Sequence, residues 1–178
     1  DLDGLSYGGR VETWVSDSLR IGATGMVEQT DIADQTAIGA DVRLQVAEES
    51  YLELEYAETE GPGFDSAISS DGGLIVTTND TAGVTDGTGE AWRARGQAEF
   101  SDIGIAVPGR VTGYYEKRSA GFSTLDYQVA NDEELWGLTL EVEPTERLGF
   151  RFYADDFEDS TGRELTEIGA ELTFKATD

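Results

Sequence analysis

The stretch VEPTERLGFRF, residues 142–152, decides the fold of this chain. A polar segment, residues 143–146, separates two runs in which apolar and polar residues alternate. Alternation places successive side chains on opposite faces of a β-strand, and polar residues between two such runs are typical of a chain reversal. The stretches VSDSLRIGA, VAEESYLEL and FSDIGIAV repeat the pattern. The sequence therefore predicts several antiparallel hairpins with tight turns.

Nine segments alternate in this way, and each has one apolar face. They cover residues 7–15, 19–27, 38–46, 51–57, 92–100, 109–116, 136–142, 148–155 and 168–174. No segment has the 3.6-residue period of an amphipathic helix. We predict an all-β chain with a single domain over residues 1–178. Its expected architecture is an antiparallel up-and-down meander β-barrel of about 8–10 strands.

The connections between these segments alternate in length. Tight turns are expected near residues 16–18, 48–50, 101–103 and 143–146, and longer loops near residues 29–35, 61–90, 117–133 and 156–163. In an antiparallel meander, alternate connections lie at opposite ends of the strands. We therefore expect tight turns at one end and long loops at the other. The LIVTT stretch inside the longest loop, residues 74–78, predicts a short extra strand.

The composition excludes several classes of protein. The chain has 37 Asp and Glu against 12 Lys and Arg, a formal charge of −25, so it repels nucleic acid, and we expect no nucleic-acid partner. It contains no Cys and no His, which excludes disulfides, thiolate metal sites and most hydrolase triads. We expect no enzymatic activity. The sequence contains no run of about 18 apolar residues, so it predicts no membrane-spanning helix.

The first residue is Asp1, and no signal-peptide pattern follows it. We expect a mature product or an excised fragment.

The strand pattern resembles a bacterial outer-membrane β-barrel. Strands of about ten residues with one apolar face, tight turns at one end and long polar loops at the other are typical of that class. The repeated turn-then-strand stretches SDSLRIGA, EPTERLGF and EESYLEL are similar to the barrel portion of large repetitive outer-membrane proteins. The resemblance implies a Gram-negative outer-membrane location, contact with outer-membrane lipid and no cofactor. It also implies a porin-like role, either as a scaffold that displays acidic extracellular loops or as a narrow pore.

The resemblance also implies two sets of site residues. A lumen charge network would neutralise opposite charges across strands, and an aromatic girdle would lie at the lipid headgroups, where aromatic rings are favoured. The network comprises Arg10, Glu12, Arg43, Glu53, Arg93, Arg95, Glu99, Arg110, Glu141 and Arg151, with Arg20, Glu55 and Glu171 sharing its pattern. The girdle comprises Tyr7, Tyr51, Trp92, Phe100, Trp136 and Phe174.

Alternation alone does not reveal which face meets water. A soluble β-barrel or β-sandwich that binds a small ligand or a glycan has the same period, with its apolar face as the core. Charges of both signs on the polar face and frequent strand glycines favour the membrane alternative. Nine strands is an odd number, whereas bacterial single-chain barrels have an even one. A remainder of a larger barrel, or an oligomer, would account for this difference.

The acidic run ADDFEDSTGRE suggests a weak Ca²⁺ site. Asp155, Asp156, Glu158 and Asp159 provide hard oxygen ligands at close spacing, but the run lacks the spacing of an EF-hand loop. A solvated loop is the simpler interpretation of the same residues.

Overall fold

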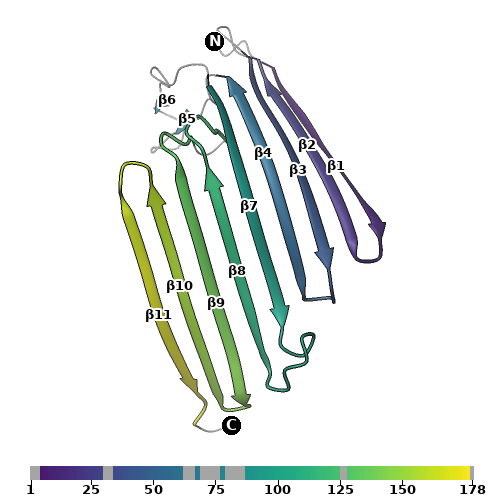
Figure 1. Cartoon of the computed structure of the whole chain (residues 1–178), viewed down its shortest axis with the longest axis vertical. Helices are drawn as coiled ribbons and strands as arrows, with labels where there is room; N and C mark the ends of the chain where they lie inside the picture. The colour runs from purple at the N-terminus through teal and green to yellow at the C-terminus, as the bar shows by residue number, and fades with distance from the viewer. Residues whose placement is uncertain are drawn as a thin grey trace.

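The structure is a computed structural model that describes residues 5–29, 34–61, 67–68, 77–78, 87–124 and 128–176. Within these ranges it contains strands and turns but no helix. Nine long strands form one antiparallel sheet, in which each strand pairs with the next long strand along the chain (Figure 1). The predicted all-β, antiparallel up-and-down meander is therefore confirmed, and the strand number lies within the expected range.

The sheet contains the long strands, and a separate ribbon contains two short ones. The long strands are β1 (Ser6–Ser16), β2 (Leu19–Glu28), β3 (Gln35–Gln45), β4 (Tyr51–Gly61), β7 (Gly87–Glu99), β8 (Gly109–Arg118), β9 (Glu133–Thr145), β10 (Leu148–Asp159) and β11 (Glu164–Phe174). The ribbon pairs β5 (Ala67–Ile68) with β6 (Thr77–Thr78). The extra strand predicted at residues 74–78 includes β6, and residues 74–76 lie outside the described residues.

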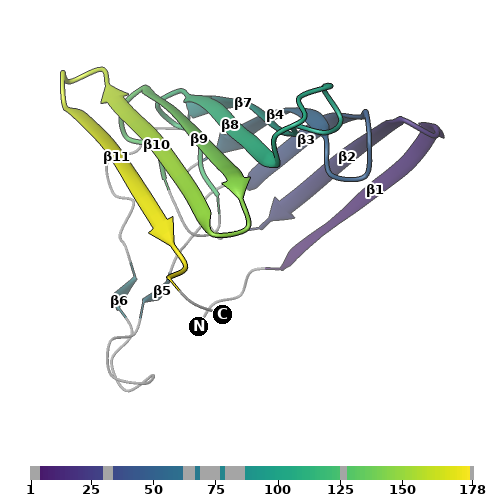
Figure 2. The same cartoon turned by 90° about the horizontal axis from the view of Figure 1, so that it is seen from below.

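The sheet is an open trough rather than the closed barrel expected from the sequence. Figure 2 shows the strands curving round from β1 at one rim to β11 at the other. Among the described residues, no pairing joins these two strands. Because successive strands alternate in direction, the first and the ninth strands of the meander run the same way. An antiparallel ladder cannot join two such strands directly.

The two ends of the trough differ, although less regularly than predicted. Figure 1 shows the β1–β2, β3–β4, β7–β8 and β9–β10 connections at its lower end, here called the turn end, and the β10–β11 connection at its upper end, the loop end. The β1–β2 and β9–β10 turns contain two residues each, Asp17–Ser18 and Glu146–Arg147. The second turn is shorter than predicted because β9 continues to Thr145, and the Glu143 N–H donates to the Pro108 carbonyl at 2.8 Å.

Two further connections differ in length from the prediction. The connection expected at residues 101–103 covers 100–108, because the Ile105 N–H donates to the Phe100 carbonyl at 2.8 Å and Gly104 has a φ of 81°, which closes a loop of its own. The loop expected at residues 156–163 covers only 160–163. Residues 156–159 continue β10 there, and residues 156–158 pair with the start of β11.

The register divides the side chains into two faces. Pairing aligns Ile21 with Val42, Val42 with Leu54 and Leu54 with Ala94, so apolar residues continue from strand to strand. This side is called the apolar face, and the opposite side, with Arg43 and Glu53, is called the charged face. Large exposed side chains on the apolar face are Tyr7, Val11, Ile21, Ile38, Val42, Leu44, Leu52, Leu54, Trp92, Tyr115, Trp136, Leu138, Phe150, Phe152, Ile168, Leu172 and Phe174.

Burial is reversed relative to a water-soluble protein. In the described part of the chain, the buried hydrophobic residues are only Phe122, Val129 and Ala154. The buried polar residues are more numerous, namely Gln35, Asp41, Ser50, Glu53, Thr59, Ser123, Glu133 and Asp159. Carboxylates are almost never fully buried unless they are paired, so the charged face must neutralise them.

The β8–β9 connection folds over the charged face at the loop end. The Val129 N–H donates to the Phe122 carbonyl at 2.8 Å, and the Ser123 N–H donates to the Thr59 hydroxyl at 3.1 Å. Gly89 on β7 lies directly beneath this segment. A Cβ at position 89 would lie 1.8 Å from the Phe122 nitrogen, so only glycine allows this close approach.

We predict that Gly89→Ala displaces the segment at residues 119–124 and lowers the free energy of unfolding by about 1–3 kcal/mol, because overpacking here meets backbone rather than a flexible side chain. Denaturant unfolding and limited proteolysis of this segment measure the two effects. Gly25→Ala is the matched control, since a Cβ at position 25 has no atom within 4 Å. Equal unfolding free energies for the two variants would contradict the assigned contact.

Candidate functional site

One continuous network of ion pairs crosses the charged face from β1 to β9. It links arginines and carboxylates through N–O distances of 4.0 Å or less, and it is called the charge network. Its members are Arg10, Glu12, Arg20, Asp41, Arg43, Glu53, Glu55, Arg93, Arg95, Glu116, Arg118 and Glu133. Every member comes from a strand, so the pleat of the sheet fixes the direction of each side chain.

Glu53 on β4 is the most connected carboxylate of the network. Its side chain is only 1% exposed, and its carboxylate accepts from Arg20 at 3.1 Å, Arg43 at 3.4 Å and Arg95. The three arginines come from β2, β3 and β7. A carboxylate removed from water is stable only when such partners compensate its lost hydration. Glu53 therefore ties four strands together.

The network spans intervening strands where the sheet curves. The Arg10 guanidinium on β1 lies 2.7 Å from the Asp41 carboxylate on β3 and passes over β2. Gly22 lies beneath this pair, and a Cβ there would be 2.3 Å from the Asp41 carboxylate. The Tyr114 hydroxyl on β8 reaches Asp155 on β10 at 3.0 Å over Gly137 in the same manner. These contacts place the charged face on the concave side.

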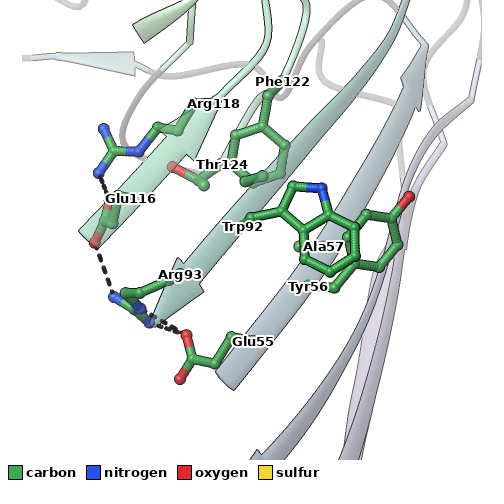
Figure 3. A pocket seen from close by; sticks show the side chains of 10 residues that line it. Glu55, Tyr56, Ala57, Trp92, Arg93, Glu116, Arg118, Phe122 and Thr124 are labelled. Carbon is green, nitrogen blue, oxygen red and sulfur yellow. Dashed lines mark hydrogen bonds and ion pairs between the residues drawn. The ribbon is translucent and has the colours of Figure 1, made fainter. Parts of the chain in front are cut away.

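The other half of the network lies at the loop end. Figure 3 shows Arg93 between Glu55 and Glu116, with Arg118 beyond Glu116. Arg118 also lies 3.7 Å from Glu133 on β9. Phe122 lies close to these groups and lines the same pocket. The network thus continues to the place where the β8–β9 connection covers the charged face.

Four of the predicted lumen residues form two ion pairs on the charged face outside the network. Arg110 contacts Glu99 at 2.5 Å, and Arg151 contacts Glu141 at 3.6 Å. All ten residues predicted for the lumen network therefore share one face and take part in ion pairs. Glu171 is aligned with Arg151 on the same face, but the structure assigns it no ion pair.

Sequence reasoning missed Asp41, Glu116, Arg118 and Glu133 as members of the network. Asp41 and Glu116 stand at polar positions of predicted strands, so the alternation could have included them. Arg118 and Glu133 lie beyond the predicted strand ends, in β8 and β9 as observed. Only the true strand boundaries reveal that they share the face.

The charge network is neutral. Six guanidinium groups, Arg10, Arg20, Arg43, Arg93, Arg95 and Arg118, balance six carboxylates, Glu12, Asp41, Glu53, Glu55, Glu116 and Glu133. The excess charge of −25 therefore lies entirely outside it. Each carboxylate is engaged by arginine, so none of them is arranged as a free general base.

A hollow of about 480 Å³ opens on the charged face near the loop end. Arg10 on β1 and Arg93 on β7 line it from two sides, and Phe122 lines it from the β8–β9 connection. Ala37, Gly39 and Ala57 supply small side chains to the lining. The lining therefore combines charged groups of both signs with small and apolar groups. Among the described residues, no group of three or more acidic side chains could hold a metal ion.

Five of the six girdle residues stand on the apolar face. Tyr7, Trp92 and Trp136 lie toward the loop end, while Phe100 and Phe174 lie at the turn end. The placement of Tyr51 was predicted wrongly. Tyr51 alternates with Leu52 and shares the face of Glu53, and the Arg43 guanidinium carbon lies 3.7 Å above its ring centroid.

Two tyrosines missed by sequence reasoning join the aromatic residues of the loop end. Tyr56 pairs with Trp92 at a ring-centroid distance of 4.4 Å, and Tyr115 is aligned with Trp136. Cross-strand register, which is set by the turns, brings these rings together. They form two aromatic pairs on β4–β7 and β8–β9, offset by two residues, which are together called the aromatic row.

The structure does not bring the four suggested Ca²⁺ ligands together. Asp155 and Asp159 point to the charged face, whereas Asp156 and Glu158 point to the apolar face, because all four belong to β10. The interpretation of this run as a solvated loop is therefore wrong. Asp156 accepts instead from the Thr166 hydroxyl at 2.5 Å.

Asp159 has a structural role at the loop end. Its carboxylate accepts from the Thr161 hydroxyl, the Thr161 N–H at 2.9 Å and the Arg163 N–H at 3.1 Å. The Thr161 hydrogen bond, supported by these N–H groups and the Arg163 charge, outweighs desolvation and lowers the pKa of Asp159. A lowered pKa means that the carboxylate fully stabilises the turn at pH values above the ordinary pKa of a carboxyl group. This contribution is lost as the pH falls through the lowered pKa.

Comparisons of the chain with protein-family models, with curated proteins and with solved structures found no match. The resemblance to outer-membrane barrels therefore rests on the strand pattern alone. Across the residues that the structure describes, no helix is long and apolar enough to span a membrane.

We predict that Glu53→Gln lowers the free energy of unfolding by about 3–5 kcal/mol, because it removes one partner from buried ion pairs. Glu12→Gln is the matched control. The Glu12 side chain is 49% exposed, and exposed ion pairs contribute about 0–1 kcal/mol. Denaturant unfolding of both variants measures the difference. Similar losses in the two variants would show that Glu53 does not hold the strands together.

Proposed function

We propose that this chain forms the wall of a β-barrel of the bacterial outer-membrane type, with its apolar face against lipid and its charged face toward a lumen. One observation carries the proposal. Large apolar side chains are exposed across all nine strands, whereas three carboxylates on the opposite face, Asp41, Glu53 and Glu133, are buried and paired with arginines. Exposed apolar side chains and buried carboxylates are the reverse of the pattern in a water-soluble protein, and they fit a chain whose outer face is surrounded by lipid hydrocarbon.

The energetics of the apolar face support the same conclusion. Burial away from water stabilises a large apolar side chain by about 1.5–3 kcal/mol. Val11, at 75% exposed, and Phe174, at 66%, lie on strands of opposite rims, so the exposed surface extends across the whole sheet. Contiguous apolar patches on monomeric soluble proteins rarely exceed a few hundred Å². Contact with lipid removes the cost of such a surface in water.

The dimensions of the strands also fit a bilayer. The long strands contain 10 to 13 residues. At about 3.3 Å per residue and a tilt of about 45°, an eleven-residue strand crosses about 25 Å, the height of the apolar band of outer-membrane barrels.

The aromatic row at the loop end indicates a headgroup boundary. On the apolar face Tyr56 is aligned with Trp92 and Tyr115 with Trp136, and the two pairs are offset by two residues because Trp92 is aligned with Lys117. Two residues beyond each ring on its own strand, toward the loop end, the same face carries Glu58, Glu90, Lys117 and Glu134. A change from apolar through aromatic to charged side chains is what the interface between hydrocarbon and water favours. The apolar face would therefore leave the hydrocarbon at this row.

The charged face favours a structural role. Its network is neutral and fully paired, and the β8–β9 connection covers part of it, so it would make a narrow lumen at most. We therefore propose a membrane-embedded scaffold or narrow pore that displays acidic loops, located in the outer membrane. A soluble barrel or sandwich would need a second layer over the apolar face, and the described residues supply none.

We predict that Leu140→Arg lowers the free energy of unfolding in lipid by about 2–4 kcal/mol, the cost of arginine near the bilayer midplane. Leu140 lies on the apolar face of β9, between Val111 and Phe152 on the neighbouring strands. Thr139→Arg is the matched control, because its side chain joins the charged face. We expect a cost below about 1 kcal/mol there. A loss below about 1 kcal/mol for Leu140→Arg would argue against the membrane placement.

A further inference from the structure

We propose that the free edges of β1 and β11 are binding sites for additional antiparallel β-strands, and that the strand on β11 presents arginine or lysine toward the charged face. The proposal rests on the proposed function, because an unpaired edge is most unfavourable in hydrocarbon. It adds the chemistry and the direction of the partner to that function.

The first argument is the state of the two edge strands. Among the residues that the structure describes, β1 pairs only with β2, and β11 pairs only with β10. One side of each strand therefore presents a row of backbone N–H and C=O groups without ladder partners. Water can satisfy these groups, but lipid cannot. In a membrane, only another β-strand supplies donors and acceptors at the required spacing.

The second argument is strand direction. β1 and β11 run the same way, from the loop end to the turn end (Figure 1). Direct closure of one trough, or β1-to-β11 pairing between two copies, would require a parallel ladder. An intervening strand that runs from the turn end to the loop end is antiparallel to both edges. The geometry therefore favours an odd number of additional strands.

The third argument is continuity of the apolar face. β1 presents Tyr7 and Val11 on this face, and β11 presents Ile168, Leu172 and Phe174, all of them exposed. The apolar surface thus reaches both free edges. A partner strand must alternate, with apolar side chains at the positions that continue this surface.

The fourth argument is unbalanced charge on β11. Its charged face carries Glu167, which accepts from the Tyr153 hydroxyl at 3.2 Å, and Glu171, which forms no ion pair with any described residue. The aligned arginine, Arg151, is 3.6 Å from Glu141 instead. On β1, by contrast, Arg10 already pairs with Glu12 and Asp41. A cationic partner side chain therefore complements β11 and is not needed at β1.

A peptide with the sequence of β10, LGFRFYADDFED, carrying the replacement Asp155→Lys, has the required chemistry. Its first seven residues alternate between the two faces, and the cations at positions 151 and 155 lie on the face of Glu171 and Glu167. The matched control peptide differs only by the Arg151→Glu replacement. The full chain is inserted into phosphatidylcholine nanodiscs, and amide hydrogen exchange of each strand is followed with increasing peptide.

We expect the arginine peptide to slow exchange over β11 at least ten-fold while exchange over the central strand β7 stays unchanged. The control peptide should need at least a ten-fold higher concentration for the same effect. Glu171→Arg in the chain should reverse the preference between the two peptides. This reversal separates charge pairing from nonspecific adsorption, because the two peptides differ at one residue.

Several results would overturn the proposal. One is an unchanged exchange rate over β11 with either peptide. Another is equal affinity for the two peptides. A third is slow exchange of β1 and β11 without peptide, which would indicate direct closure if it is independent of chain concentration and pairing of copies if it rises with concentration. Failure of the chain to enter nanodiscs would contradict the proposed function. Insertion without slower amide exchange over β11 on addition of peptide would contradict only this inference.

Discussion

Neutralisation of buried charge on the concave face is the constraint on which the rest of the structure depends. Glu53 is almost inaccessible and is held by arginines from three other strands. A slip of one residue in any pairing would move a whole strand's side chains to the opposite face. Arginines would then enter the apolar surface, and carboxylates would lose their partners. The network therefore specifies register as well as contributing to stability.

Curvature follows from the same contacts. Pairs such as Arg10 with Asp41 and Tyr114 with Asp155 bridge strands that are not neighbours, and they meet only because the sheet bends toward the charged face. Gly22 and Gly137 leave the space that these side chains occupy. Glycine normally weakens a strand, so its use here reflects the need for close approach. The glycines in the sequence therefore allow the sheet to bend, and the bend allows ion pairs and hydrogen bonds between strands that are not neighbours.

The sequence predicted the faces well, because a period of two assigns each residue to a side without knowledge of the turns. It located seven arginines of the charged face on one side of the sheet, although it missed Arg118. It failed where the outcome depends on tertiary pairing. The connection at residues 100–108 and the extension of β10 to Asp159 are set by cross-strand hydrogen bonds that no local pattern announces. Tyr51 was assigned to the wrong face because only its position near the turn was considered. Its alternation with Leu52 places it on the charged face. Closure could not be predicted, because it depends on which strands meet the two edges.

The most direct test of the account uses the three tryptophans of the chain. Trp92 and Trp136 lie on the apolar face, whereas Trp14 is aligned with Arg20 on the charged face. Three variants that each keep one tryptophan, with phenylalanine at the other two positions, are placed in liposomes. Fluorescence quenching by brominated lipid and by aqueous acrylamide is then compared. The account predicts that brominated lipid quenches Trp92 and Trp136 far more than Trp14, and that acrylamide shows the reverse order. Equal quenching of all three by acrylamide, with no effect of brominated lipid, would contradict the outward orientation of the apolar face.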